Sequence, residues 1–91
     1  MPRVEIYTTA YCPYCIRAKM LLNQKQVSYQ EIAVDRDPER RREMMARSRR
    51  HTVPQIFIGT THVGGCDDLL ELERQGQLDG LLTAADTTTA E

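Results

Sequence analysis

VEIYTTAYCPYCIRAKMLL, residues 4–22, determines the architecture of this chain. Apolar and polar side chains alternate over residues 4–8, a period of two that is typical of a β-strand. Pro13 then stands where proline is favoured at the start of a helix, and apolar residues follow at helical spacing as far as Leu22. Cys12 and Cys15 therefore lie at a junction between a strand and a helix.

That junction predicts a reactive dithiol. Backbone N–H groups and the helix dipole favour a negative charge at a helix N-terminus, where Cys12 is placed. The thiolate is the nucleophilic form of cysteine, so we expect Cys12 to attack disulfides. Cys15 lies one turn further along the helix and is expected to be more buried and less activated. An inert disulfide or two core cysteines is the alternative, but the position at a junction favours redox chemistry.

Length and composition narrow the remaining possibilities. The chain has 91 residues, enough for one small domain, with 12 basic and 13 acidic side chains and a net charge of −1. That balance predicts no general attraction to nucleic acid or to a membrane surface. No stretch approaches the ~20 apolar residues of a membrane span, and no secretory signal is visible. Three cysteines, an odd number, argue against a fully paired extracellular framework, so we expect a cytoplasmic protein.

The middle of the chain adds a second strand and a second helix. Residues 27–34 have the pattern of a strand, and the crossover of about 18 residues before them predicts parallel pairing with the first strand. Asp37 followed by proline is typical of a helix start. We expect this helix to run to about Ser48, with Met44 and Met45 facing inward and its arginines facing solvent.

A hairpin and a third helix are expected next. Residues 55–58 and 62–64 read as short strands, and the Gly-Thr-Thr connection between them is typical of an antiparallel hairpin. A helix capped by Cys66 or Asp67 is expected over residues 68–74.

The complete pattern predicts one α/β domain over residues 1–82. Gly76 should end the third helix, and residues 79–82 should add one further turn. The order β-α-β-α-β-β-α then gives a four-stranded mixed sheet flanked by helices. Residues 83–91 are small and polar, and we expect them to form a disordered tail.

Three segments together resemble the glutaredoxins. They are TTAYCPYC at residues 8–15, TVPQIFI at residues 52–58 and GGCDD at residues 64–68, in this order and at these separations. The likeness is greatest to the small bacterial dithiol type and covers residues 4–82. It implies the thioredoxin fold, with glutathione as the reducing co-substrate and no tightly bound cofactor or metal. The Pro-Tyr pair between the cysteines and the absence of tryptophan distinguish the chain from most thioredoxins.

The same resemblance implies roles for the two cysteines. Cys12 would be the nucleophile that forms a mixed disulfide, and Cys15 the thiol that resolves protein disulfides by forming a Cys12–Cys15 bond. Two glutathione molecules would then reduce that bond. Disulfide-containing or glutathionylated proteins are the implied partners, with glutathione reductase and NADPH as the indirect source of electrons. A monomer is expected.

A glutathione site is also implied by the resemblance. Its expected members are Tyr14, Arg50, Thr52, Val53, Pro54, Gly65, Cys66 and Asp67. A cis bond before Pro54 would present the N–H and C=O of Val53 to the ligand backbone. The N–H groups of Cys66 and Asp67 would bind the γ-glutamyl carboxylate, and the Asp67 side chain the ammonium group. Arg50 would pair with the glycyl carboxylate, unless it belongs to the solvated face formed by the arginines around it.

Two positions depart from the family pattern. Many glutaredoxins carry a lysine or arginine shortly before the first active-site cysteine, where this chain has Thr8-Thr9-Ala10. The missing cation removes one charge that would stabilise the thiolate. Arg49 stands where relatives often have glycine, so a different local loop shape is expected.

Three alternative functions stay open at this point. A zinc site using Cys12, Cys15 and Cys66 or a histidine would need four ligands, and the chain has only one short-spaced cysteine pair. An iron–sulfur carrier would bind a cluster between two protomers through Cys12 and glutathione, which the Pro13-Tyr14 dipeptide disfavours. A thioredoxin-like protein reduced by a flavoenzyme is the nearest enzymatic rival.

Overall fold

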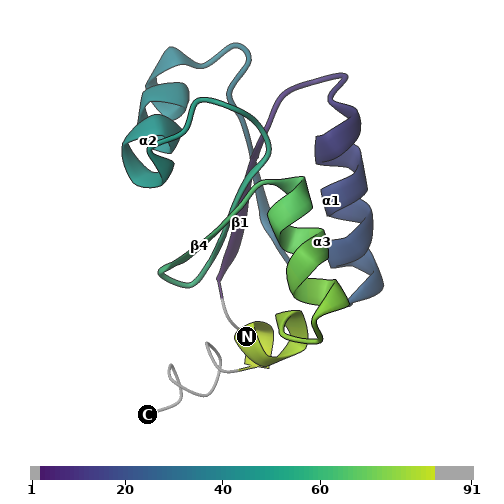
Figure 1. Cartoon of the computed structure of the whole chain (residues 1–91). Coiled ribbons are helices and arrows are strands. Elements are labelled where there is room, and N and C mark those ends of the chain that lie inside the picture. The colour runs from purple at the N-terminus through teal and green to yellow at the C-terminus, as the bar shows by residue number, and fades with distance from the viewer. Residues whose placement is uncertain (1–2, 84–91) are drawn as a thin grey trace.

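The computed structural model describes residues 3–83, which form a four-stranded sheet with helices on both faces (Figure 1). In chain order the elements are β1 Val4–Thr8, α1 Pro13–Gln24, β2 Gln30–Ala33, α2 Pro38–Ser48, β3 Gln55–Ile58, β4 Thr61–Gly64 and α3 Cys66–Arg74. The expected order β-α-β-α-β-β-α and the α/β fold class are confirmed.

β1 lies inside the sheet, which has the order β2-β1-β3-β4. It pairs parallel with β2, as the crossover length predicted, and antiparallel with β3. β3 and β4 form the predicted antiparallel hairpin. Because β1 and β3 run in opposite directions, the end of β1 meets the start of β3, and Tyr7 lies opposite Gln55. Everything that follows β1 or precedes β3 is therefore brought to the same end of the sheet.

Two apolar cores hold the three layers together. α1 and α3 lie side by side on one face of the sheet, and α2 lies on the opposite face (Figure 1). The first core includes Ile6, Ala18, Leu22, Ile56, Leu69 and Leu78. The second consists of Tyr7, Ile32, Val34, Met44 and Phe57. Fully burying one such aliphatic or aromatic side chain stabilises the fold by about 1.5–3 kcal/mol, so these residues fix the relative positions of the helices.

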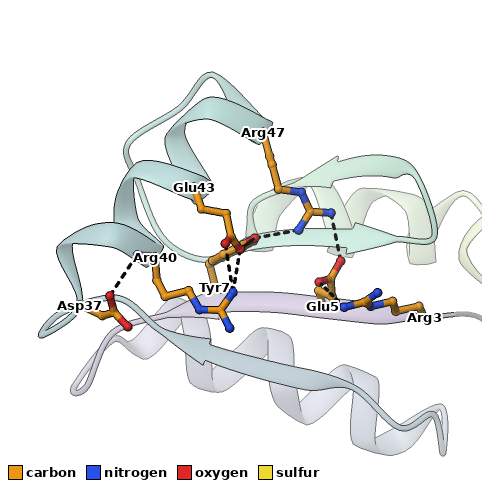
Figure 2. A network of polar contacts seen from close by, with 7 residues as sticks. All are labelled: Arg3, Glu5, Tyr7, Asp37, Arg40, Glu43 and Arg47. Carbon is orange, nitrogen blue, oxygen red and sulfur yellow. Dashed lines mark hydrogen bonds and ion pairs between the residues drawn. The ribbon is translucent and has the colours of Figure 1, made fainter.

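The face of β1 that carries Glu5 and Tyr7, which the alternation marked as polar, is also buried. Figure 2 shows the polar contacts on this face. Glu5 points toward α2 with its side chain 9% exposed, and its Oε1 accepts a hydrogen bond from Nη2 of Arg47 at 3.0 Å. Nη1 of Arg47 donates to the Tyr7 hydroxyl at 2.7 Å. The Arg47 guanidinium also lies 4.0 Å from the ring centroid of Phe57. Tyr7 in turn donates to Glu43, and this hydrogen bond lowers the pKa of the Glu43 carboxyl.

Three predicted element details are wrong. Met45 is 41% exposed, because neighbouring residues of a helix point about 100° apart and only Met44 faces the sheet. β2 covers Gln30–Ala33 rather than residues 27–34, since only these four residues pair with β1. β4 begins at Thr61, one residue earlier than predicted.

The described part of the chain ends in a short helical turn. Gly76, with φ +73°, follows α3 as predicted, and residues 78–83 are helical. This turn extends one residue beyond the predicted residue 82, and residues 84–91 of the predicted tail lie outside the described residues. No helix within residues 3–83 is long and apolar enough to cross a membrane.

Candidate active site

The first cysteine of the pair caps helix α1. Cys12 has the extended conformation of an N-cap residue, and Pro13 occupies the first helical position as predicted. The Cys12 Sγ accepts a hydrogen bond from the N–H of Cys15 at 3.2 Å. The Cys12 carbonyl accepts the first helical hydrogen bond, from the N–H of Ile16 at 3.0 Å. The sulfur thus faces the positive end of the helix, where a negative charge is stabilised.

Cys15 lies in a different environment. Its side chain is 1% exposed, whereas Cys12 is partly exposed. Burial, followed by the hydrogen bond with Cys12, raises the pKa of Cys15 to about 12. Cys15 therefore stays protonated at neutral pH. Both are free thiols here, so the pair is in its reduced form with one sulfur accessible and the other protected.

The loop between α2 and β3 carries the predicted cis bond, Val53–Pro54. This loop begins at Arg49, which ends α2 in the left-handed conformation with φ 59°. That conformation costs a non-glycine residue about 1–2 kcal/mol. The N–H of Arg50 then donates to the Ser48 hydroxyl at 3.0 Å, which fixes the start of the loop.

Asp68 joins this loop to the start of α3. Its Oδ2 accepts hydrogen bonds from the N–H of Gly65 at 2.9 Å and from Nη1 of Arg50 at 3.0 Å. These two donors, the Gly65 N–H first, lower the pKa of the Asp68 carboxyl. The N-cap of α3 is therefore Gly65, and the predicted caps Cys66 and Asp67 are instead the first two residues of the helix.

The two glycines before α3 allow close approach of the surrounding groups. Gly64 has φ +116°, and a Cβ there would stand 2.3 Å from the Oδ2 of Asp68. A Cβ on Gly65 would stand 3.4 Å from the carbonyl oxygen of Pro54. A side chain at Gly64 would therefore displace the Asp68 carboxylate from the position in which it binds Arg50.

A groove of about 230 Å³ separates the cis-proline loop from the start of α3. Its lining residues are Tyr14, Arg50, Thr52, Val53, Pro54, Gly65, Cys66, Asp67 and Asp68. All eight predicted glutathione contacts are thus brought together around one groove, which begins beside Tyr14 within the CPYC segment. One arginine and two aspartates line it, a charge distribution suited to a ligand that carries both signs.

Asp68 was not among the predicted site residues, and the predicted residue Cys66 has a buried side chain. Sequence reasoning missed Asp68, although an acidic residue three positions after the N-cap is the signal of a capping box. Cys66 is 3% exposed, and burial raises the pKa of the Cys66 thiol, with further contributions from Asp67 and Cys12. A protonated, buried thiol is a poor nucleophile, so the side chain of Cys66 is part of the wall of the groove rather than a second reactive sulfur.

The alternative of a zinc site would need several ligating side chains close together. Among residues 3–83, no three side chains of His, Cys, Asp or Glu lie close enough together to hold a metal ion.

Comparison with known proteins gives the family. The profile of the glutaredoxin family matches residues 4–63. A glutaredoxin of Pseudomonas aeruginosa is 64% identical over 84 residues, which cover 92% of this chain and 100% of that protein. Glutaredoxin 3 of Escherichia coli K12 is 57% identical over 82 residues, or 90% of this chain and 99% of that protein.

Solved structures agree with the sequence relatives. A buckwheat glutaredoxin–glutathione complex has a TM-score of 0.85 at 33% identity and covers 93% of this chain and 80% of its own. A glutaredoxin from Brucella melitensis has a TM-score of 0.80 at 57% identity, with 90% and 89% covered. At these identities and coverages, the chain belongs to the glutaredoxin family, whose members are thiol–disulfide oxidoreductases.

Proposed function

We propose that this glutaredoxin reduces protein disulfides and glutathione mixed disulfides with its Cys12–Cys15 dithiol, and that glutathione restores the dithiol. The observation that carries the proposal is the inequality of the two sulfurs. Cys12 is accessible and accepts an N–H hydrogen bond at a helix N-terminus. Cys15 is buried, and its pKa is raised to about 12. The first sulfur is therefore suited to attack, and the second becomes a nucleophile only after Cys12 has been bonded.

The groove supplies the recognition of glutathione. Its lining includes Val53 of the cis-proline loop, Cys66 and Asp67 at the start of α3, and Arg50. We assign the peptide backbone of glutathione to Val53, its γ-glutamyl carboxylate to the N–H groups of α3, and its glycyl carboxylate to Arg50. The Asp67 carboxylate pairs with the ammonium group. The buckwheat relative was solved as a glutathione complex, which supports this assignment.

Two reactions follow from this arrangement. With a glutathionylated protein, the Cys12 thiolate attacks the glutathione sulfur and the protein thiolate leaves and takes up a proton. A second glutathione thiolate then attacks the glutathione sulfur on Cys12, which releases glutathione disulfide and the Cys12 thiolate. With a protein disulfide, Cys15 displaces the reduced protein from Cys12, and two glutathione molecules reduce the resulting Cys12–Cys15 bond. The first reaction consumes one free glutathione thiol, because the other half of the glutathione disulfide comes from the mixed disulfide, and the second reaction consumes two.

A glutathione-coupled assay with a glutathione mixed disulfide tests the proposal. Cys12→Ser should abolish turnover, while Cys15→Ser should keep most of it because the second step needs only free glutathione. With a protein disulfide as substrate, both variants should lose turnover. Cys66→Ser is the matched control, since it removes a thiol of the same groove that the reaction does not use. An active Cys12→Ser variant would show that the nucleophile has been assigned wrongly.

The source of electrons needs a separate comparison. Turnover with glutathione, glutathione reductase and NADPH should greatly exceed turnover with thioredoxin reductase and NADPH. The opposite result would favour a thioredoxin-like protein reduced by a flavoenzyme. A cytoplasmic location, a monomeric state and the domain boundary at residue 82 stay predictions.

A further inference from the structure

A buried amide lies directly beneath the cis-proline loop. Gln55, the first residue of β3, is 0% exposed and is one of few polar side chains in the interior of residues 3–83. Its Nε2 donates to the carbonyl oxygen of Thr52 at 3.1 Å and to the Thr52 hydroxyl at 3.2 Å. The NH₂ group of the amide thus binds two oxygen atoms of one residue of the groove wall.

A contact with His62 is consistent with one orientation of the Gln55 side-chain amide. The Oε1 of Gln55 lies 2.7 Å from Nε2 of His62. A carbonyl oxygen can only accept, so the proton of this hydrogen bond is on the imidazole, and the NH₂ group of Gln55 faces Thr52. The imidazole is itself held by stacking on Phe57, with ring centroids 4.8 Å apart. His62, Gln55 and Thr52 therefore form one directed chain of hydrogen bonds that runs from β4 to the groove.

The chain sets the orientation of a peptide group. The Thr52 carbonyl and the Val53 N–H belong to the same planar unit, and in a trans peptide they point in opposite directions. Only the next bond, Val53–Pro54, is cis. Because the Thr52 carbonyl points to buried Gln55, the Val53 N–H points away from the interior. Among residues 3–83 this N–H has no hydrogen-bond acceptor, and Val53 lines the groove.

We infer that Gln55, held by His62, is a positioning residue that turns the Val53 N–H toward the backbone of the bound glutathione moiety. Gln55 does not contact the ligand, and it acts only through the peptide plane. This inference rests on the proposed function, since it presumes that glutathione occupies the groove. Loss of the amide should therefore weaken binding of the ligand and leave the chemistry at Cys12, on another element, unchanged.

Titration of ¹⁵N-labelled protein with S-methylglutathione, followed by two-dimensional NMR, tests this inference. Gln55→Met keeps the length of the side chain and removes its hydrogen bonds. We expect the Val53 amide resonance to shift before ligand is added, and the Kd to rise about fivefold, the loss of one neutral hydrogen bond. In the glutathione-coupled assay, KM for a glutathione mixed disulfide should rise by a similar factor with kcat within about twofold.

Tyr7→Phe is the matched control. It removes a buried hydroxyl from the residue opposite Gln55 on the same face of the sheet, but that hydroxyl binds Glu43 and Arg47 rather than the loop. Its Kd for S-methylglutathione should equal that of the wild type. His62→Phe keeps an aromatic ring on Phe57 and removes the donor to Gln55, so it should raise Kd about twofold. If Gln55→Met does not fold, the His62→Phe variant alone tests the inference.

The outcomes separate two kinds of failure. If the wild type does not bind S-methylglutathione, the proposed function is wrong. If the wild type binds it and the folded Gln55→Met or His62→Phe variant binds it equally well, the positioning role is wrong and the proposed function stands. An equal rise of Kd in Tyr7→Phe would also overturn the inference, because general loosening of this face would then explain the effect.

Discussion

Removal of the Arg47 guanidinium should destabilise the fold more than any other single arginine substitution in α2. Arg47→Met keeps most of the aliphatic stem, so the perturbation is confined to the charged group. In the wild type that group binds Glu5 and donates to the Tyr7 hydroxyl (Figure 2). It also lies over the Phe57 ring. After substitution, the cationic partner that Glu5 keeps within residues 3–83 is Arg3, whose Nη2 lies 3.5 Å from Oε2 of Glu5 and whose side chain is 73% exposed.

The expected loss can be worked from these contacts. Breaking a fully buried ion pair by removing one partner costs about 3–5 kcal/mol. The Arg47 side chain is 33% exposed and Arg3 remains nearby, so roughly half of that, about 2 kcal/mol, is expected. Loss of the contact with the Phe57 ring adds about 0.5–1 kcal/mol. The total of about 2–3 kcal/mol corresponds to a fall in Tm of about 10–20 °C for a domain of this size.

Urea unfolding followed by circular dichroism provides the measurement. Arg42→Met is the control, because Arg42 lies on the same helix and makes no hydrogen bond or ion pair within residues 3–83. It should change the free energy of unfolding by less than about 0.5 kcal/mol. Adding Glu5→Gln to Arg47→Met should recover about 1 kcal/mol or more, since a neutral amide needs no counter-charge. Equal stability of the Arg47→Met and Arg42→Met variants would refute the argument from burial.

Three further predictions concern the site and its supports. Iodoacetamide at pH 8 should alkylate Cys12 of the wild type rapidly. In the Cys12→Ser variant the Cys15 thiol, whose pKa is raised to about 12, should react at least tenfold more slowly. Mass spectrometry measures both rates, and comparable rates would show that Cys15 is not protected. Gly64→Ala should lower the free energy of unfolding by about 2 kcal/mol or more in a urea titration, because its Cβ meets the Asp68 carboxylate at a positive φ. The pKa values of the Asp68 and Glu43 carboxyls are lowered in the folded protein. Both carboxylates therefore contribute fully to the free energy of unfolding above their pKa values in the unfolded chain, about 3.9 and 4.3, and this contribution is lost as pH falls through their pKa values in the folded protein. Urea unfolding between pH 6 and pH 2.5 should therefore show a decline at the acid end that is shallower in Asp68→Asn, and parallel curves would contradict this.

The sequence was sufficient for features with local causes. The CPYC helix start, the Asp37 cap and the end of α3 before Gly76 each depend on residues a few positions apart, and each was predicted correctly. The residue sets that line the groove came from the resemblance to glutaredoxins. Spacing alone carries no information about which loops meet at one end of the sheet.

Features with distant partners were missed. Glu5 reads as a solvent-facing strand residue, but it is buried because Arg47, 42 positions later, neutralises it. Gln55 was missed for the same reason. It is a polar residue in an otherwise apolar strand, and its side chain is buried because His62 of β4 and Thr52 of the loop satisfy its hydrogen bonds. A polar side chain inside a sheet can be interpreted only when the groups that satisfy it are known.

The proposed ligand contacts in this fold come largely from the main chain, and this has a consequence for variation among glutaredoxins. The N–H groups of Val53, Cys66 and Asp67 survive every substitution except proline, so ligand binding depends on where their peptide planes point. One side chain fixes the first of those planes directly, and another holds the residue that precedes the other two. Gln55 holds the Thr52 carbonyl, and Asp68 holds the Gly65 N–H at the start of α3. Neither residue belongs to the helix that presents Cys12. Affinity for the ligand and reactivity of the sulfur can therefore change independently, and a substitution such as Gln55→Met should separate them.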